Sequence, residues 1–406
     1  MTHTSAAVRT GHTTMSVGAA DALDAASFTI LRQFPPPAEN ATRRGADAGT
    51  GLLFALTARR IQPAERQELL PGLRHWLMSA TGEVSHYGVF GNGLSGFVVG
   101  LDHAAQVQPE LEPLAAAARD RLLDWIHRSP WQVKEIDWAD YDLIYGPSGN
   151  ALVLCAAATP ASQLAPLRDQ LTALCTPGLP GLRVGRRHSG DPQDFNLHRV
   201  NTGLGHGVPG VVAALCALIR ACGPAPDLLL ALDNAAQFLV RACYRDAHGV
   251  LSWRPMHDAS DAAPLHAREQ VWCYGGPGVS WALWDAAQLL GDASLAEFGL
   301  AAVGSLCAAW DGERYLLERH PGSTLCICHG AAGVLSVADA FARHAGFAPA
   351  ARLRDHLFEY LMDRLPAIIA LAEVDSTMLT GASGVLAALD LVRGGPRSWL
   401  CQLGLR

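Results

Sequence analysis

The sequence predicts an all-α fold, a double-layered α/α barrel (toroid) of six to seven helical hairpins. Six times, a turn of the form G-x-x-G opens an apolar run, with first glycines 51–68 residues apart, and self-similarity at such a spacing indicates a repeat architecture. Each turn opens a run that is apolar nearly all the way round, which is typical of an inside helix. A more amphipathic stretch follows within the repeat, which is typical of an outer helix. Stacked in a ring, such pairs give two layers of helices.

The six turns share two glycines three residues apart and set the order of the elements. They lie at residues 93–96, 146–149, 207–210, 275–278, 330–333 and 381–384. The inner run after the third turn covers 211–219, and two outer stretches cover 228–244 and 350–365. A weaker copy at residues 49–56 would make seven hairpins. Because the same turn opens every inner helix, we expect the helix N-termini, and the residues beside them, to meet at one mouth of the barrel.

The N-terminal segment is expected to be less well ordered than the rest of the chain. Residues 1–45 are rich in Thr, Ala and Gly and run into Pro35-Pro36-Pro37, which indicates a poorly ordered tail or adapter with a helix around residues 19–33. From residue 46 to residue 406 the composition is uniform, without a linker. These residues are therefore expected to form a single α/α-barrel domain.

The composition limits the partners of the chain. Of its 406 residues 50% are hydrophobic and only 17% are charged, with a net charge of −7, whereas an average soluble domain has about 25% charged residues. Such a chain can bury a large core. Lys134 is the only lysine, which excludes a lysine-rich nucleic-acid groove, and the mild acidity argues against a nucleic-acid partner.

The sequence also indicates a compartment. Residues 1–30 hold no basic cluster followed by an apolar stretch, so no signal peptide is expected. Prolines interrupt the longest uncharged stretches, such as 143–167, so no membrane span is expected. The ten cysteines are too few for a disulfide scaffold. We therefore expect a reducing cytoplasm, where cysteines are core residues, metal ligands or catalytic groups.

Soft metal ligands stand beside three of the turns. His206 precedes the third turn, Cys273 precedes the fourth by two residues, and Cys328-His329 abuts the fifth. Two thiolates and one imidazole would leave one position of a tetrahedral zinc site open, as in a catalytic site, and sulfur favours zinc over magnesium or calcium. Cys326 is also a candidate ligand, because residues 326 and 328 point to the same side if the segment is extended. Its greater distance from the turn makes it the second choice.

His206 and Asp142 are the candidate acid–base residues. His206 is either a fourth metal ligand or a general acid/base, and an open metal position favours the second role. Asp142 stands four residues before Gly146 of the second turn. Its carboxylate either orients and balances the His206 imidazole or caps a helix.

Four segments of the sequence resemble the lanthionine synthetase C-like family, the lantibiotic cyclases. Residues 201–210 (NTGLGHGVPG) resemble its His-Gly motif, 272–278 (WCYGGPG) its Trp-Cys-Tyr-Gly motif, 328–330 (CHG) its Cys-His-Gly motif, and 141–146 (YDLIYG) its Asp-bearing turn. The similarity extends over residues 46–406. It implies an α/α toroid that binds one zinc ion through Cys273, Cys328 and His329.

The resemblance implies an activity and its partners. The enzyme would add a cysteine thiolate of a dehydrated precursor peptide to dehydroalanine or dehydrobutyrine, which forms the thioether of lanthionine or methyllanthionine. His206 would move the proton, Asp142 would hold the imidazole, and Tyr274 would line the site. The family also uses an arginine upstream of the Trp-Cys-Tyr-Gly motif; Arg268 is the candidate, although it lies five residues before Cys273, one more than expected. The partners implied are the precursor with its leader, a dehydratase and an exporter.

Three other classes of protein compete with this interpretation. A prenyltransferase-like barrel also activates thiols with zinc, but its zinc set includes an Asp and it needs a basic diphosphate pocket. An α/α-barrel glycosidase needs two acids across a cleft, and Asp142 is the only acid among the turn residues. A non-catalytic zinc-holding scaffold that binds a peptide or thiol within a modification complex would not need His206 and Asp142.

Overall fold

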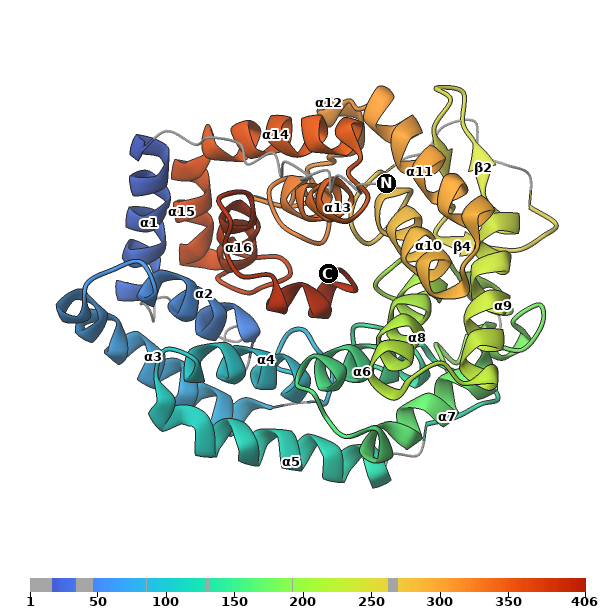
Figure 1. The fold of residues 1–406 in the computed structure, drawn as a ribbon, viewed down its shortest axis with the longest axis horizontal. Coiled ribbons are helices and arrows are strands. Elements are labelled where there is room, and N and C mark those ends of the chain that lie inside the picture. The colour runs from blue at the N-terminus through green and yellow to red at the C-terminus, as the bar shows by residue number, and fades with distance from the viewer. Residues whose placement is uncertain (1–16, 34–46, 85, 129–130, 192, 262–268) are drawn as a thin grey trace, which may run out of the picture.

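Seven inner helices follow one another around a closed ring (Figure 1) in the computed structural model, which describes residues 17–33, 47–84, 86–128, 131–191, 193–261 and 269–406. They are α2 (Ala48–Ala58), α4 (Leu94–Ala105), α6 (Pro147–Ala156), α8 (Val208–Cys222), α10 (Pro277–Leu290), α13 (Ala331–His344) and α16 (Ala382–Val392). Each packs against the next, and α16 packs against α2. The predicted α/α toroid is confirmed, and the weaker copy at residues 49–56 is the seventh inner helix, α2.

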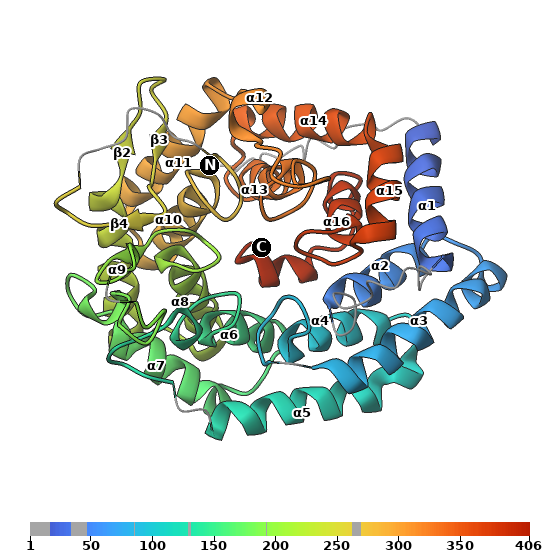
Figure 2. The same ribbon diagram turned by 180° about the vertical axis from the view of Figure 1, so that it is seen from behind.

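Amphipathic helices surround this ring as an outer layer (Figure 2). They are α1 (Val17–Arg32), α3 (Pro63–Glu83), α5 (Glu112–Arg128), α7 (Ala165–Leu174), α9 (Pro226–Ala242), α11 (Ala293–Ala308), α14 (Ala348–Met362) and α15 (Leu365–Val374). For example, α9 packs against α8 and buries Leu228 and Leu232, whereas Leu230 is exposed. The outer stretch predicted at 350–365 belongs to two helices, because Pro366 in a first turn begins α15.

Short elements join the two layers. They are α12 (Gly312–Tyr315) and the 3-10 helices η2 (Pro109–Leu111), η3 (Trp138–Asp140), η4 (Ala161–Leu164), η5 (Pro180–Leu182) and η6 (Ser398–Leu403). Two small antiparallel sheets pair β1 (Val200–Asn201) with β4 (Met256–His257) and β2 (Tyr244–Arg245) with β3 (Leu251–Ser252). Among the described residues, no helix has both the length and the apolar character needed to cross a membrane.

The helix predicted around residues 19–33 is α1. It buries Leu23, Ala26 and Ile30 and packs against α3 and α15, so it lies in the outer layer between the last and the first repeats (Figure 1). This part of the expected tail or adapter therefore packs on the barrel. Residues 1–16 and 34–46 lie outside the described residues.

The second glycine of each turn has a packing role. The loop before the turn folds back over the first turn of the inner helix, and a Cβ on Gly333 would lie 2.0 Å from the Ile327 carbonyl oxygen. A Cβ on Gly384 would likewise lie 1.9 Å from the Met378 oxygen. No side chain fits at such distances. The second glycine therefore lets each loop pack directly on its inner helix. This packing places the residues after Ile327 and Met378 at the mouth of the barrel.

Backbone hydrogen bonds link these loops in order around the mouth. The donor–acceptor pairs are Val89 N to Ile144 O (2.9 Å), Leu143 N to Gly205 O (3.0 Å), Leu204 N to Cys273 O (2.8 Å), Cys273 N to Cys328 O (3.4 Å) and Cys328 N to Leu379 O (3.0 Å). The Asp47 side chain accepts the next bond, from Met378 N at 2.6 Å. Residues far apart in sequence are thus held side by side on one rim, as the repeat predicts.

A Gly333→Ala variant is expected to lose about 1–3 kcal/mol of stability or more, because its Cβ would collide with the Ile327 backbone. It should also displace the neighbouring Cys328. Thermal unfolding and metal binding measure both effects. Gly18→Ala is the matched control, because it lies in α1 with nothing within 4 Å of an added Cβ and should stabilise the chain by up to about 1 kcal/mol. Equal melting temperatures for the two variants would contradict this role.

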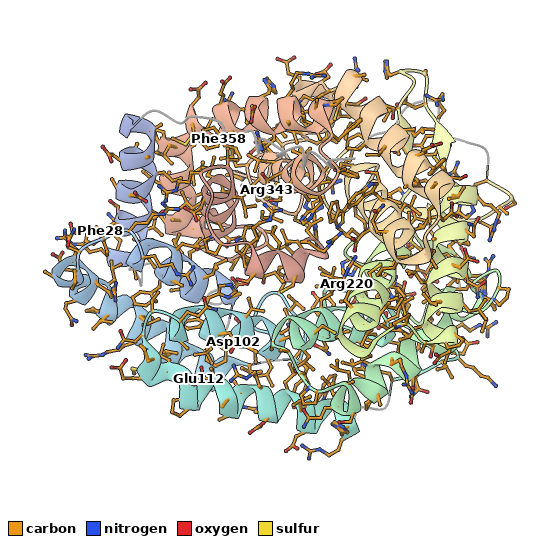
Figure 3. The ribbon with its side chains drawn as sticks, viewed as in Figure 1. Phe28, Asp102, Glu112, Arg220, Arg343 and Phe358 are labelled. Carbon is orange, nitrogen blue, oxygen red and sulfur yellow. The ribbon has the colours of Figure 1, made fainter. Side chains whose placement is uncertain are left out.

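Buried carboxylates in the C-terminal halves of the inner helices are neutralised by arginines. Asp285 of α10 pairs with Arg220 of α8 and with Arg406, and Asp339 of α13 contacts Arg343. Figure 3 labels Arg220, Arg343 and Asp102, which pairs with Arg119 in the same way. The last residues of the chain lie inside the ring (Figure 1). These pairs therefore close the barrel away from the helix N-termini.

Candidate metal centre and active site

Cys273, Cys328 and His329 form one cluster at the mouth. The potential ligand atoms of the three side chains all lie within 4.8 Å of one another, and Cys328 Sγ is 4.0 Å from His329 Nε2. The hydrogen bond from Cys273 N to Cys328 O joins the two loops that carry them. Both thiols are buried, and His329 is partly buried. The geometry brings together the three side chains that the sequence analysis selected.

The electrostatics of the cluster suit a soft cation. Burial raises the pKa of the Cys273 thiol well above its usual value. A hydrogen bond from that thiol lowers the pKa of Cys328, and the Cys328 sulfur in turn raises the pKa of His329. Deprotonation of the two thiols would give a set of two sulfurs and one nitrogen. Such a set fits zinc.

Cys326, the second choice as a ligand, has a different environment. Its side chain is fully buried, and its thiol donates to the Ser323 carbonyl oxygen at 3.3 Å. Burial raises the pKa of Cys326 to about 12. It does not belong to the metal-ligand cluster found among the described residues.

His206 and Asp142 form a pair next to this cluster. His206 Nδ1 lies 2.6 Å from Asp142 Oδ2. The pKa of Cys328 is lowered mainly by its hydrogen bond with Cys273, and His206 is close enough to add a smaller lowering effect. The other oxygen of Asp142 accepts hydrogen bonds from the backbone of Tyr145 and Gly146, each at 2.7 Å. The carboxylate therefore ties the turn before α6 and contacts the imidazole, and it does not cap α6 itself.

Aromatic rings hold the His206 imidazole in place. The ring of Trp138, from η3, stacks on it with centroids 4.7 Å apart, and the ring of Tyr145 lies 6.1 Å away in a nearly parallel plane. Asp142 is fully buried, and burial raises its pKa. His206 is partly exposed, so the imidazole is fixed in orientation yet accessible from the mouth.

The remaining two predicted site residues are Tyr274 and Arg268. The Tyr274 ring lies over the backbone of Gly203, where an added Cβ would come within 2.5 Å of the ring. Burial raises the pKa of Tyr274 to about 12, so its phenol is neutral at physiological pH. Arg268 lies outside the described residues.

The sequence analysis missed an ion pair beside the cluster. Arg319 donates to Glu269 through Nε at 2.9 Å and through a second guanidinium nitrogen. Glu269 raises the pKa of Arg319, and the nearby Cys273 and Cys328 sulfurs raise it further. Arg319 stands eleven residues before Gly330, the first glycine of the fifth turn, outside any motif. In contrast, Tyr145 directly precedes the second turn and could have been found from the repeat.

Comparisons with known proteins agree with this geometry. A family model described as "Lanthionine synthetase C-like protein" matches residues 75–399. A solved structure named "Nisin cyclase" is 16% identical in sequence and has a TM-score of 0.78, over 93% of this chain and 96% of that one. At that identity the likeness shows the fold, an α/α toroid. The search of curated proteins finds no match. Because the family model spans most of the sequence, the chain belongs to the lanthionine synthetase C-like family.

Proposed function

We propose that this chain is a zinc-dependent lanthipeptide cyclase. It would add cysteine thiolates of a dehydrated precursor peptide to dehydroalanine or dehydrobutyrine and form lanthionine or methyllanthionine rings. The observation that carries the proposal is the cluster of Cys273, Cys328 and His329, with all ligand atoms within 4.8 Å, next to the His206–Asp142 pair. Family membership and the fold shared with nisin cyclase support it.

The three clustered side chains would hold one zinc ion. Two thiolates and one imidazole leave a fourth position for the substrate. Bound zinc would lower the pKa of a substrate thiol, so that the thiolate is present at neutral pH. Tyr274 follows Cys273 directly and would line the substrate's path as a neutral hydrogen-bonding group. Arg268 lies outside the described residues and is proposed only as the counterpart of the family's arginine.

His206 would transfer the proton of the reaction. The thiolate forms a C–S bond to the β-carbon, the C=C π bond breaks, and its electron pair moves into an enolate that takes a proton at the α-carbon. Because Asp142 accepts the Nδ1 proton, Nε2 is the nitrogen that can exchange one. The proton lost by the thiol thereby returns to the α-carbon, and no atom leaves.

The proposal is tested with zinc-loaded protein and a dehydrated precursor that retains its leader. Free thiols should fall with time while the peptide mass stays constant, because addition is an isomerisation. Unchanged thiols would contradict a cyclase. The precursor, a dehydratase and an exporter are the proposed partners, and the cytoplasm is the proposed compartment.

A further inference from the structure

A cavity of about 290 Å³ lies among the loops at the mouth of the barrel. Loops before α2, α4, α6 and α16 line it, with Asp47, His86, Tyr145 and Asp375 among their residues. It adjoins the proposed active site, because the Tyr145 ring also stacks on His206. The mechanism above uses none of its acidic groups.

One carboxylate of this cavity is buried and incompletely bonded. Asp47 is 3% exposed, and its Oδ1 accepts hydrogen bonds from Gly49 N at 2.8 Å and from Met378 N at 2.6 Å. Its Oδ2 has no hydrogen bond of ordinary geometry among the described residues, although the Gly91 backbone N–H lies near enough to the carboxylate to lower its pKa slightly. Burial raises the pKa of Asp47 to about 7. A buried acceptor left in this state is costly unless a ligand satisfies it.

A second carboxylate, also without a cation, lies close by. The charge of Asp375 raises the pKa of Asp47, and Asp375 is bonded to the hydroxyls of Thr377 and Thr380. Neither acid forms an ion pair within the described part of the chain, unlike Asp285 and Asp339. His86 supplies no charge, because burial lowers its pKa and its Nδ1 accepts from Gly88 N. The two carboxylates of the cavity therefore have no positively charged partner among the described residues.

We propose that this cavity binds a cationic ammonium group of the peptide substrate, with Asp47 and Asp375 as its counter-ions. The volume suits the end of a side chain rather than one metal ion. A metal site would also gather three or more carboxylate or imidazole ligands, and the described residues gather such a set only at Cys273, Cys328 and His329. That the cation belongs to a peptide rests on the proposed cyclase function.

An adjoining apolar cavity supports a peptide as the occupant. It measures about 780 Å³ and lies along α15, lined by Leu325, Leu371 and Val374. Asp375 and Thr380 line both cavities, so the acidic space continues into the apolar one. A chain bound here would place apolar side chains beside its ammonium group.

The test measures peptide binding by the zinc-loaded full-length chain. The probes are acetylated, amidated peptides Cys-(Gly)n-Lys, with n from 0 to 4, each compared with its norleucine counterpart by calorimetry. The thiol directs each peptide to the mouth, and at one spacing lysine should bind about 10-fold tighter than norleucine, a charged-pair gain. A second series with a free N-terminal amine in place of lysine shows which ammonium group the cavity prefers.

Two variants test whether Asp47 and Asp375 cause the preference for lysine over norleucine. Asp47→Asn keeps the Oδ1 acceptor, and Asp375→Asn provides an independent variant; each should reduce the lysine preference to about threefold or less. Asp169→Asn, which removes an exposed charge on α7, should leave it unchanged. Equal affinity for lysine, free-amine and norleucine peptides at every spacing, or a preference that survives in both cavity variants, overturns the proposal. Because binding is measured rather than ring formation, a failed thiol assay with the lysine preference intact refutes the cyclase function alone.

Discussion

Replacing Cys273 by alanine is expected to remove bound zinc and cyclisation together. The substitution takes away one of two sulfur ligands and also the thiol that lowers the pKa of Cys328. Without the metal the substrate thiol keeps its ordinary pKa, so the loss should equal the several kcal/mol of stabilisation that a catalytic metal supplies, about 10³-fold or more in rate. Metal content by elemental analysis and free-thiol counts measure the two effects.

Cys326→Ala is the matched control for this loss. Cys326 is buried two residues from Cys328, but its thiol is bonded to Ser323 and lies outside the cluster. The variant should melt at a lower temperature because a buried side chain is truncated, yet it should keep one zinc per chain and its activity. If Cys326→Ala lost the metal and Cys273→Ala retained it, the ligand assignment would be wrong.

The fold could be predicted largely from one repeated turn. G-x-x-G is visible in sequence because the second glycine, as at Gly333, has no room for a Cβ. The weak first copy is harder to recognise because α2 begins after Asp47 rather than after a glycine. The division into α14 and α15 could not be read from hydrophobic periodicity, since both helices bury one face and only Pro366 marks the break.

Part of the candidate site could likewise be predicted from the sequence, and part of it could not. Side chains beside the turns could be named in advance because the ring brings the turns together, and the cluster and the His206–Asp142 contact follow from that. Arg319 reaches the site from a loop without a repeat, so no spacing predicts it. Asp47 is an acceptor for two backbone groups, and its unsatisfied oxygen is visible only in three dimensions.

Replacing His206 by alanine is expected to leave zinc in place and to lower the cyclisation rate by about 10² to 10⁴-fold, the range for loss of a positioned general acid/base. The reason is geometric, because His206 stands beside the metal-ligand cluster without belonging to it among the described residues. Its imidazole is held by Asp142 and by the Trp138 ring. Zinc content, substrate affinity and single-turnover cyclisation should separate metal binding from proton transfer.

Asp142→Asn tests how the imidazole is held. Asparagine can still accept the backbone hydrogen bonds of Tyr145 and Gly146, so the turn should persist, but it cannot balance a protonated His206. The cyclisation rate should therefore fall in this variant while zinc content stays at one per chain. For the His206→Ala variant, His188 is the matched control, since it pairs with Asp137 at 2.7 Å and its ring also packs against Trp138. His188→Ala should retain most of the rate. Loss of zinc in the His206 variant would instead make His206 a fourth ligand and close the position assigned to the substrate.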